Sequence, residues 1–418
     1  MKRHLIGIGG VGMSALATAL VRLGDEVTGA DRTLGTANIA FLETLGVRCF
    51  PDDGSGLDAD ADEVVISSAI EPDNAGLVKA RALGIPVVHR AAALARALAG
   101  YKLVAVVGTC GKSTVTAMLG HLLAECGFDP MCVNGANVPG WQGAVRFGRG
   151  EYAVAEVDES DKSLFAFSPY AAIITNAASD HYPKEEMDEV FDRFARDLEG
   201  PVVDGRRGEA EKFLYGRGLD ALDVPVPGAH NLQNARLAAA MAVALGCPPE
   251  AVLKAMAGFQ GVERRLQRIV PPGGVAPGAP AVFDDYAHNP DKLAAMWITL
   301  AGEFPRGICV IWRPHGYAPL RKMLDALAAT FRSVARPCDT LLLLPVYDAG
   351  GTADRSINSS ALAAKLPAGL CIEVADHPAA CAWIEAHRDN YDCIAVCGAR
   401  DPELSRTAAK IAAMFAKG

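Results

Sequence analysis

One stretch of the chain, residues 102–123, limits the possible folds more than any other. Its sequence, KLVAVVGTCGKSTVTAMLGHLL, passes from an apolar run through a glycine-rich turn into a long helical pattern. A strand, a tight glycine turn and a helix in this order are typical of a phosphate-binding loop in a parallel α/β sheet. The alternative is a structural turn that carries an exposed lysine.

The residues of this turn suit an anion. Gly108 and Gly111 would let the backbone wrap around a phosphate. Lys112 would supply a point charge to the β- and γ-phosphates, and the hydroxyl of Ser113 would bind Mg²⁺. The common phosphate loop has a glycine where this chain has Val106, so the loop predicted here is shorter.

Apolar runs bounded by turn residues alternate with Ala- and Leu-rich helical patterns along the chain. Helical spacing of apolar residues occurs in residues 15–23, 116–126, 186–197 and 232–245. The strand-like runs are HLIGIG, EVVISSAI, KLVAVVG, AVAEV, AAIITNA, GICVIW, TLLLLPVY and CIAVCG. This alternation predicts an α/β protein with mainly parallel sheets.

A chain of 418 residues is long enough for several domains. A new strand is expected at Lys102, after the alanine-rich HRAAALARALAGY, and the segment Pro271–Pro280, PPGGVAPGAP, has the composition of a linker. We therefore expect three domains. They are residues 1–98, Rossmann-like; residues 99–266, a P-loop ATPase-like parallel sheet; and residues 267–418, again Rossmann-like.

Composition narrows the partners and the compartment. The formal net charge of −9 argues against nucleic acid or an anionic membrane as the main partner. Eleven scattered cysteines without a CxxC pair predict reduced thiols. The N-terminus lacks the apolar segment of a signal peptide, and no apolar run reaches the ~18 residues of a membrane span. These features predict a cytoplasmic protein.

A second glycine motif stands at the N-terminus. GIGGVGMSALA places Gly7, Gly9 and Gly12 in a GxGxxG frame between a strand and a helix. Asp31 follows about 20 residues later, where dinucleotide folds hold a ribose-binding acid. The motif alone leaves three interpretations open: an NAD site, a site for another nucleotide diphosphate, or a tight structural turn.

Short loops of the form G-T-x-G-K-[ST]-T occur in the Mur ligase family, and this chain resembles that family along its whole length. The matching motifs appear in the family's order: GIGGVGMSALA, VVISSAI, ARALGIPVVHRAAAL, AEVDESDKS, TNAASDH, PGAHNLQNA, FQGVERRL, DDYAHNPDKL, RPHGY and LPVYDAGG. The resemblance implies an ATP-dependent ligase that joins an amino acid to UDP-N-acetylmuramate through an acyl phosphate, in peptidoglycan precursor synthesis. L-Alanine is the leading expectation for the amino acid.

The resemblance also implies site residues. For ATP they are Gly108, Thr109, Cys110, Gly111, Lys112, Ser113, Thr114, His230, Asn231, Asn234, Arg265, Asp285 and Tyr286. For the UDP substrate they are Gly9, Gly10, Val11, Gly12, Met13, Ser14, Asp31, Ser67 and Ser68. The amino-acid pocket would contain His288, His315, Tyr317 and Arg321. Ser113 and Glu156 would hold one Mg²⁺ and His181 a second, and the catalytic groups would be Lys112, Glu156, His181 and His288.

Single-residue alternatives remain beside these assignments. Glu156 lies in the acidic run AEVDESD, which would also suit a solvated loop, and Asn231 would also serve as a helix cap. Arg265 would equally be a surface arginine, and the HNP sequence after Tyr286 is also a turn signal.

Several positions depart from the pattern of the alanine-adding branch. Cys110 stands where that branch has His, and Ala178 where it has Glu. In PHGYAP, Gly316 and Pro319 replace two arginines that help to hold the amino acid, and Arg321 is a candidate substitute. A related ligase for another amino acid or a murein peptide, and an inactive nucleotide-binding homologue, are the alternatives. We expect a monomer or homodimer.

Overall fold

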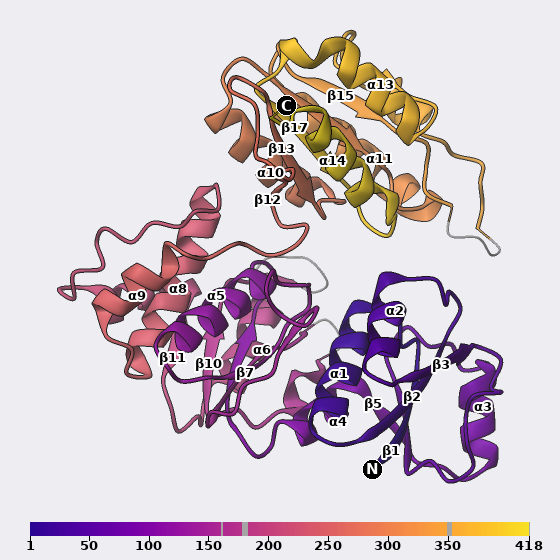
Figure 1. Ribbon diagram of the computed structural model, residues 1–418, viewed down its shortest axis with the longest axis vertical. Helices are drawn as coiled ribbons and strands as arrows, with labels where there is room; N and C mark the ends of the chain where they lie inside the picture. Colours follow the sequence, from indigo (N-terminus) through magenta and orange to yellow (C-terminus); the bar gives the residue numbers. More distant parts are fainter. Residues whose placement is uncertain (160–161, 178–182, 349–352, 418) are drawn as a thin grey trace. The chain divides into compact units, whose positions relative to one another are not determined.

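The computed structural model describes residues 1–159, 162–177, 183–348 and 353–417. The chain forms two compact units, of which unit 1 comprises Met1–Pro225 with His230–Val262, and unit 2 comprises Val226–Ala229 with Glu263–Gly418. Three sheets carry the fold, two in unit 1 and one in unit 2 (Figure 1). All three are mainly parallel, so the expected α/β class is confirmed.

The first sheet of unit 1 has the strand order β3-β2-β1-β4-β5, and every pair of neighbours is parallel. Its strands are β1 (Lys2–Ile6), β2 (Glu26–Asp31), β3 (Arg48–Pro51), β4 (Glu63–Ile66) and β5 (Val87–His89). Its helices are α1 (Val11–Arg22), α2 (Ala37–Thr44), α3 (Ala75–Ala82) and α4 (Arg90–Ala97).

The second sheet of unit 1 has the order β11-β10-β6-β9-β7-β8 and is parallel except for the pair β7–β8. Its strands are β6 (Lys102–Val107), β7 (Met131–Val133), β8 (Val145–Arg146), β9 (Tyr152–Glu156), β10 (Ala171–Ile174) and β11 (Val202–Asp204). Its helices are α5 (Lys112–Glu125), α6 (Lys184–Phe194), α7 (Glu209–Leu214), α8 (Ala229–Ala244) and α9 (Pro249–Met256), with short 3₁₀ turns η1 (Ser163–Ala166) and η2 (Gly205–Arg207).

Unit 2 contains the third sheet, of order β12-β13-β17-β14-β15-β16, in which only β12–β13 is antiparallel. Its strands are β12 (Gln267–Arg268), β13 (Ala281–Asp285), β14 (Ile308–Trp312), β15 (Thr340–Leu343), β16 (Cys371–Glu373) and β17 (Cys393–Cys397). Its helices are α10 (Pro290–Glu303), α11 (Tyr317–Val334), α12 (Ser360–Ala363), α13 (His377–His387) and α14 (Glu403–Met414), with a 3₁₀ turn η3 (Arg388–Asn390).

The apolar strand runs are buried because helices cover both faces of these sheets. Neighbouring residues of one strand enter different cores: Val282 packs with α13 and α14, whereas Phe283 packs with α10 and α11. In unit 1, one continuous apolar core extends from the first sheet into the second, from Leu5 to Phe191.

The Pro-rich segment Pro271–Pro280 is not a linker between the units. It connects β12 to β13 inside unit 2, where the Ala276 amide donates to the Phe415 carbonyl at 2.9 Å. The antiparallel pair β12–β13 requires a turn at this position, and Pro and Gly supply one as readily as they supply a linker.

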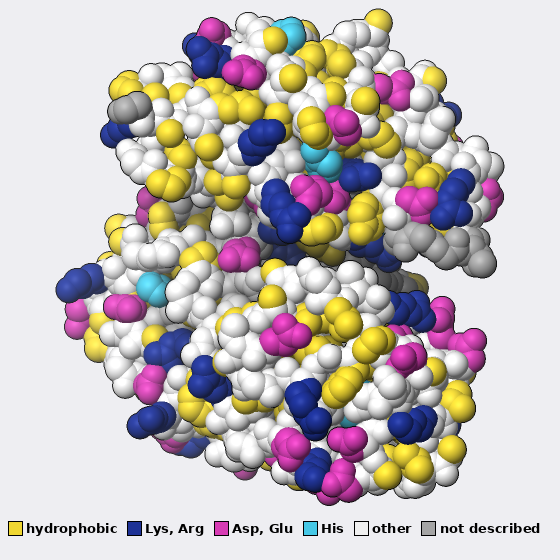
Figure 2. Space-filling model, turned by 45° about the vertical axis from the view of Figure 1, so that its right-hand side comes forward, with side chains coloured by type: hydrophobic (Ala, Val, Ile, Leu, Met, Phe, Trp, Pro, Cys, Tyr) yellow, Lys and Arg dark blue, Asp and Glu magenta, His cyan; other side chains and the backbone are white. Residues whose placement is uncertain are grey.

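All eleven cysteines lie in the described part of the chain and are free, as their spacing predicts. No helix among the described residues is long and apolar enough to cross a membrane. On the face drawn in Figure 2, acidic and basic side chains are interspersed.

Candidate functional site

The loop predicted to bind phosphate, here called the phosphate loop, lies between β6 and α5, and its geometry requires its glycines. Gly108 has φ +128° and Gly111, the residue before α5, has φ +83°, both in the region that favours glycine. A Cβ on Gly111 would lie 2.6 Å from Oδ1 of Asn234. Any larger residue would therefore close the space between the loop and α8.

Two residues after β10 brace this loop. The Thr175 hydroxyl donates to the Cys110 carbonyl at 2.7 Å, and Asn176 Nδ2 donates to the same oxygen at 3.0 Å. Asn176 Oδ1 accepts from the Thr109 hydroxyl at 2.7 Å and from the Cys110 amide at 3.0 Å. The TNAASDH motif thus fixes the loop's backbone. Cys110 itself is exposed, while Ser113 and Thr114 are buried.

Lys112 is not an exposed lysine on a structural turn. Its side chain is 14% exposed, and its ammonium donates to Glu159 Oε2 at 2.8 Å, Glu159 Oε1 at 3.0 Å and the Gly108 carbonyl at 2.7 Å. Burial alone would lower the pKa of Lys112, but the charges of Glu159 and Glu156 outweigh it and raise that pKa. The lysine is therefore a buried cation held in place by a buried carboxylate.

Glu156 ends β9 beside this pair. Its Oε2 accepts from the Gly135 amide at 2.7 Å, so it is fixed by the backbone and is not part of a fully solvated loop. Glu156, Asp158 and Glu159 all act electrostatically on the single ammonium of Lys112. This excess of hard, negatively charged oxygen fits Mg²⁺. Among the described residues, however, no three acidic, His or Cys side chains converge as a metal cage.

The helix α8 supplies the next group of expected residues. It begins at Ala229, so Asn231 lies within its first turn and is not the helix cap. Asn231 and Asn234 are buried, and Asn234 lies against Gly111 of the phosphate loop. His230 is exposed. The structure therefore brings Asn234 to the phosphate loop within unit 1.

The N-terminal glycine loop lies between β1 and α1. The Gly9 amide donates to Asp31 Oδ2 at 2.9 Å, and Asn38 Nδ2 donates to the Gly9 carbonyl at 2.9 Å. Asp31 thus orients the loop itself. Among the other expected residues, Met13 is in the apolar core and the Ser14 hydroxyl donates to the Val11 carbonyl at 3.0 Å. Gly10 precedes α1 without a side-chain cap, so its region offers backbone amides.

Arg90 was not expected from the sequence, yet it lies on this glycine loop. A Cβ on Gly12 would lie 2.8 Å from Nη1 of Arg90, so the absence of a side chain there admits the guanidinium. The other nitrogen, Nη2, donates to Asp158 Oδ2 at 3.2 Å. One arginine thus contacts both the N-terminal glycine loop and the acidic run after β9.

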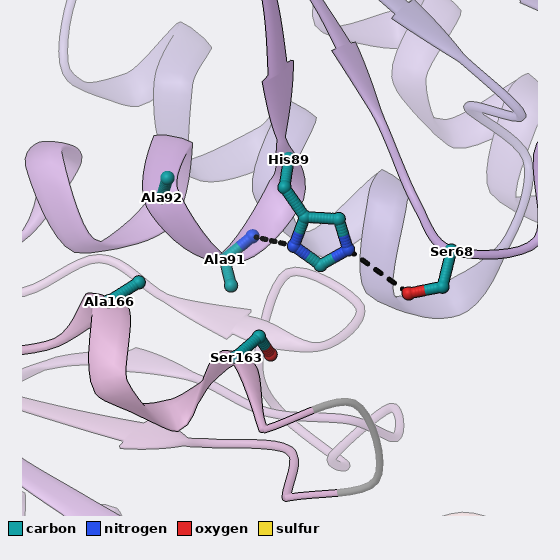
Figure 3. Close-up of a pocket in the computed structure, with 6 residues that line it drawn as sticks. All are labelled: Ser68, His89, Ala91, Ala92, Ser163 and Ala166. Atoms are coloured by element: carbon teal, nitrogen blue, oxygen red, sulfur yellow. Dashed lines mark hydrogen bonds between the residues drawn. The ribbon is translucent and has the colours of Figure 1, made fainter.

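A cavity of about 420 Å³ is lined in part by His89 and Ala91, the sequence neighbours of Arg90. Its lining comes from the end of β4, from β5 and α4, and from η1 (Figure 3): Ser68, His89, Ala91, Ala92, Ser163 and Ala166. His89 Nδ1 accepts from the Ala91 amide at 3.3 Å, which leaves the proton on Nε2, 3.2 Å from the Ser68 hydroxyl. The cavity therefore combines two adjacent polar groups with small apolar walls.

In unit 2, the expected nucleotide-side residues surround the end of β13. Asp285 accepts from the Leu266 amide at 2.6 Å and from the Ala287 amide at 2.7 Å. The guanidinium carbons of Arg264 and Arg265 lie 5.1 Å and 5.8 Å from the centre of the Tyr286 ring. Arg265 thus belongs to a cluster with Tyr286 and is not an isolated surface arginine.

The expected amino-acid pocket of unit 2 is partly assembled. The rings of His288 and His315 meet edge to face at 4.9 Å. Burial lowers the pKa of His315 to about 4, with further repulsion from His288, Arg400 and Lys292. Arg321 is ion-paired to Asp354 at 2.8 Å and donates to the Ser356 hydroxyl at 2.9 Å. Tyr317 begins α11.

Two positions discussed from the sequence, Ala178 and His181, lie outside the described residues. The other expected residues form two groups, one in each unit. Unit 1 holds the glycine loop and phosphate loop, with Glu156 and α8, and unit 2 holds the Asp285 turn and the histidine pair.

Comparisons with known proteins decide the family. The model described as "Mur ligase family, catalytic domain" matches residues 2–102, and the model described as "Mur ligase, glutamate ligase domain" matches residues 264–400. The UDP-N-acetylmuramate–L-alanine ligase of Arthrobacter sp. (strain FB24) is 36% identical over 88% of this chain and 85% of the relative. The chain belongs to the Mur ligase family.

Further Mur ligases support the same placement. The UDP-N-acetylmuramate–L-alanine ligase of Chelativorans sp. (strain BNC1) is 34% identical over 87% of both chains. Among solved structures, the UDP-N-acetylmuramate–alanine ligase of Thermotoga maritima shares the fold, with a TM-score of 0.79 at 24% identity over 99% of both chains. The murein peptide ligase of Psychrobacter arcticus 273-4 has a TM-score of 0.64 at 18% identity, over 98% of this chain and 99% of that one.

Three residues of this Mur ligase site were missed from the sequence: Glu159, Asn176 and Arg90. Glu159 and Asn176 stand within motifs that match the family. These motifs indicated where the site lies, but not which of their residues make these contacts. Arg90 also stands within a matched motif, ARALGIPVVHRAAAL, but nothing in that motif indicates a contact with Gly12, 78 residues earlier in the chain.

Proposed function

We propose that this Mur ligase joins L-alanine to UDP-N-acetylmuramate at the expense of ATP. The observation that carries the proposal is the agreement with ligases of that name, at 33–36% identity, over 86–88% of this chain. The buried pair of Lys112 and Glu159 on a glycine phosphate loop supports the ATP-dependent step.

The UDP substrate would bind on the first sheet. The amides at the start of α1 and the guanidinium of Arg90 would receive its diphosphate, because both are donors directed at the glycine loop. The cavity lined by Ser68 and His89 has the volume and the polar groups for a sugar. From there the muramyl carboxylate would extend toward the acidic run that begins at Glu156.

The phosphates of ATP would bind at the loop between β6 and α5. Lys112 and the loop amides would hold the β- and γ-phosphates, and Asn234 would approach the nucleotide from α8. Ser113 and Glu156 would hold Mg²⁺, which neutralises phosphate charge when bound. The remaining ligands of such an ion would come from ATP and water, and His181 would bind a second Mg²⁺.

The proposed reaction has two steps. A carboxylate oxygen of the muramyl group attacks the γ-phosphorus, the bond to the β-phosphate oxygen breaks, and ADP leaves with that electron pair. The neutral amine of L-alanine then attacks the acyl carbon, the acyl–phosphate bond breaks, and inorganic phosphate leaves while the amine loses a proton. The protein's task is to bring two anions together and to neutralise the transferred charge, which Lys112 and the loop amides are built to do.

Unit 2 would supply the remaining groups. Asp285 would bind the ATP ribose, Arg265 would reach a phosphate, and His288, His315 and Tyr317 would line the amine side. Of these residues, His315 has a pKa lowered to about 4, so its imidazole stays neutral at pH 7 and one ring nitrogen can accept a hydrogen bond.

The identity of the amine substrate is the most specific part of the proposal. Gly316 and Pro319 in PHGYAP alter the pocket that would hold it, and murein peptide ligases share the fold. A murein tripeptide or another amino acid is therefore the competing amine.

The experiment is phosphate release with ATP, Mg²⁺ and UDP-N-acetylmuramate, across a panel of amino acids and the murein tripeptide, with products weighed by mass spectrometry. We expect release to require L-alanine and the product to gain one alanyl residue. Release with the tripeptide alone would reassign the amine. No turnover with any amine, despite ATP binding, would overturn the proposed ligation. A Lys112→Met variant is the control for release at the proposed site.

A further inference from the structure

Arg400 has a backbone conformation that an arginine rarely adopts. It follows β17 by three residues and has φ +67°. Non-glycine residues in this region carry a conformational cost, and such positions cluster at ligand sites. The side chain is exposed, and within the described part of the chain it forms no hydrogen bond or ion pair that would explain this conformation.

The sheet order places the loop of Arg400 next to the loops that lead to the two histidines of unit 2. Strand β17 pairs with β13 on one side and β14 on the other, with Cys397 opposite both Asp285 and Trp312. The loops that follow these three strands therefore start side by side at one edge. The Gly398 amide donates to the Asp285 carbonyl at 3.2 Å, which ties the loop of Arg400 to the turn that leads to His288.

Positive groups accumulate at this edge. Lys292 lies in the first turn of α10, just after His288, and Arg400 and Lys292 both act electrostatically on His315. Lys292 likewise has no hydrogen-bonding or ionic partner for its ammonium among the described residues. Among the described residues, the side chains of Arg400 and Lys292 have no ionic partner, and two such cations near His315 favour an anionic ligand.

Two carboxylates beside this edge, Asp285 and Asp401, already have partners. Asp285 accepts two backbone amides, and Asp401 is bound by Arg313 at 2.6 Å and by His377 at 2.9 Å. The pKa of Asp401 is lowered to about 2: burial opposes this, but His377 and Arg313 prevail. By contrast, Arg321, the arginine suggested by the sequence for this pocket, is paired with Asp354.

We infer that Arg400 and Lys292 form the site that binds the carboxylate of the incoming amino acid. The guanidinium fork would take both carboxylate oxygens, and the ammonium of Lys292 would add a second positive charge. The amine of the same molecule would then face the His288–His315 pair. This inference rests on the proposed function and names the residues that select an amine bearing a carboxylate.

The test compares L-alanine with L-alaninamide, which has the amine but no carboxylate, in the wild type and in Arg400→Gly. Glycine relieves the positive φ, so the melting temperature should stay equal or rise. We expect the KM for L-alanine to increase about 10- to 100-fold, the effect of losing a charged hydrogen bond. The KM for L-alaninamide and the Kd for ATP should not change. Lys292→Ala should act in the same direction with a smaller effect.

Arg406→Ala is the matched control. Arg406 pairs with Glu403 on the exposed side of α14, so the variant removes the same charge from the same segment. An unchanged KM for L-alanine in Arg400→Gly would overturn the inference, and so would an equal rise for L-alaninamide. A fall in melting temperature would identify Arg400 as a structural residue.

The activity of the wild type with different amines shows separately whether the proposed function fails. If another carboxylate-bearing amine is the substrate, the same acid-to-amide comparison applies to it. If no amine is used, L-alanine is titrated into the wild type while the imidazole resonances of His288 and His315 are followed by NMR. A shift in the wild type that Arg400→Gly abolishes supports the site, and the absence of a shift in the wild type overturns it.

Discussion

At the scale of single residues, Glu159 neutralises Lys112 on the loop that we propose binds the phosphates of ATP. A buried ammonium needs a partner, since an unpaired charge at 14% exposure would be strongly destabilising. Glu159 supplies that partner with two contacts of 2.8 and 3.0 Å. The carboxylate therefore occupies the place on the ammonium that a phosphate would need.

A variant without the carboxylate charge of Glu159 tests whether Glu159 competes with phosphate for Lys112. Glu159→Gln keeps the size of the side chain, and we expect the Kd for ATP measured without Mg²⁺ to fall about tenfold, worth ~1.4 kcal/mol. The melting temperature without ATP should fall, because Lys112 loses its counter-ion. Calorimetric titration checks the first effect, and thermal unfolding the second. Glu151→Gln, which breaks the exposed pair with Lys102, is the control. Weaker ATP binding in Glu159→Gln would mean that Glu159 assists the nucleotide.

His4 gives a second residue-scale prediction, on stability against pH. It lies on β1 at 1% exposure, and burial lowers its pKa to about 4. The unfolded chain binds the proton below about pH 6.5, whereas the folded chain binds it only near pH 4. Stability contributed by the neutral imidazole is therefore complete above pH 6.5 and is lost as the pH falls toward 4.

Between pH 7 and pH 5 the loss from His4 should reach about 2 kcal/mol in the free energy of unfolding. His4→Val suits a buried strand and carries no proton, so we expect its free energy of unfolding to lose about 2 kcal/mol less over this range. Urea unfolding at both pH values measures the difference. Equal pH dependence in the two proteins would contradict the assignment to His4.

At the scale of elements, Arg90 connects the start of α1 to the acidic run after β9. The guanidinium lies on Gly12 at the start of α1 and bonds Asp158 beyond β9 at 3.2 Å. Since the diphosphate of the UDP substrate is proposed to bind at α1, the substrate would compete with Asp158 for this arginine. Arg90 thus links the first sheet to the second.

We expect Arg90→Ala to raise the KM for UDP-N-acetylmuramate about tenfold, the lower range for a charged hydrogen bond, while the Kd for ATP stays constant. Steady-state kinetics and nucleotide titration measure the two. Arg22→Ala is the matched control, because Arg22 Nε donates to Gln142 at 2.8 Å and also links the two sheets, but away from Gly12. An equal rise of KM in both variants would attribute the effect to sheet packing.

The sequence was sufficient for these elements but not for the contacts between them. The long apolar runs predicted the central strands of each sheet, and the two glycine motifs predicted both loops, whereas short strands such as β3, β7 and β16 were not among the predicted runs. Which of Glu156, Asp158 and Glu159 faces Lys112 depends on how the backbone turns after β9, and the spacing does not specify that. The neighbourhood of Arg400 depends on β17 lying between β13 and β14, a strand order that local sequence does not encode.

At the scale of the whole molecule, the proposed ligand sites are divided between the two units, and each unit has apolar cores of its own. Unit 1 has a continuous core through its two sheets and holds the proposed UDP-substrate and phosphate sites. Unit 2 has its own cores on the two faces of the third sheet and holds the proposed amino-acid site. A ligand bound to one folded unit stabilises that unit by mass action.

Calorimetric unfolding should therefore show two transitions, since residues of the first and second sheets share one core and unfold together. UDP-N-acetylmuramate at 100 times its Kd should stabilise one transition by about 2.7 kcal/mol and leave the other unchanged. L-Alanine should shift the other transition, and Arg400→Gly should abolish that shift while preserving the response to the UDP substrate. A single transition moved by both ligands would contradict the division, and it would mean that the two units unfold as one cooperative body.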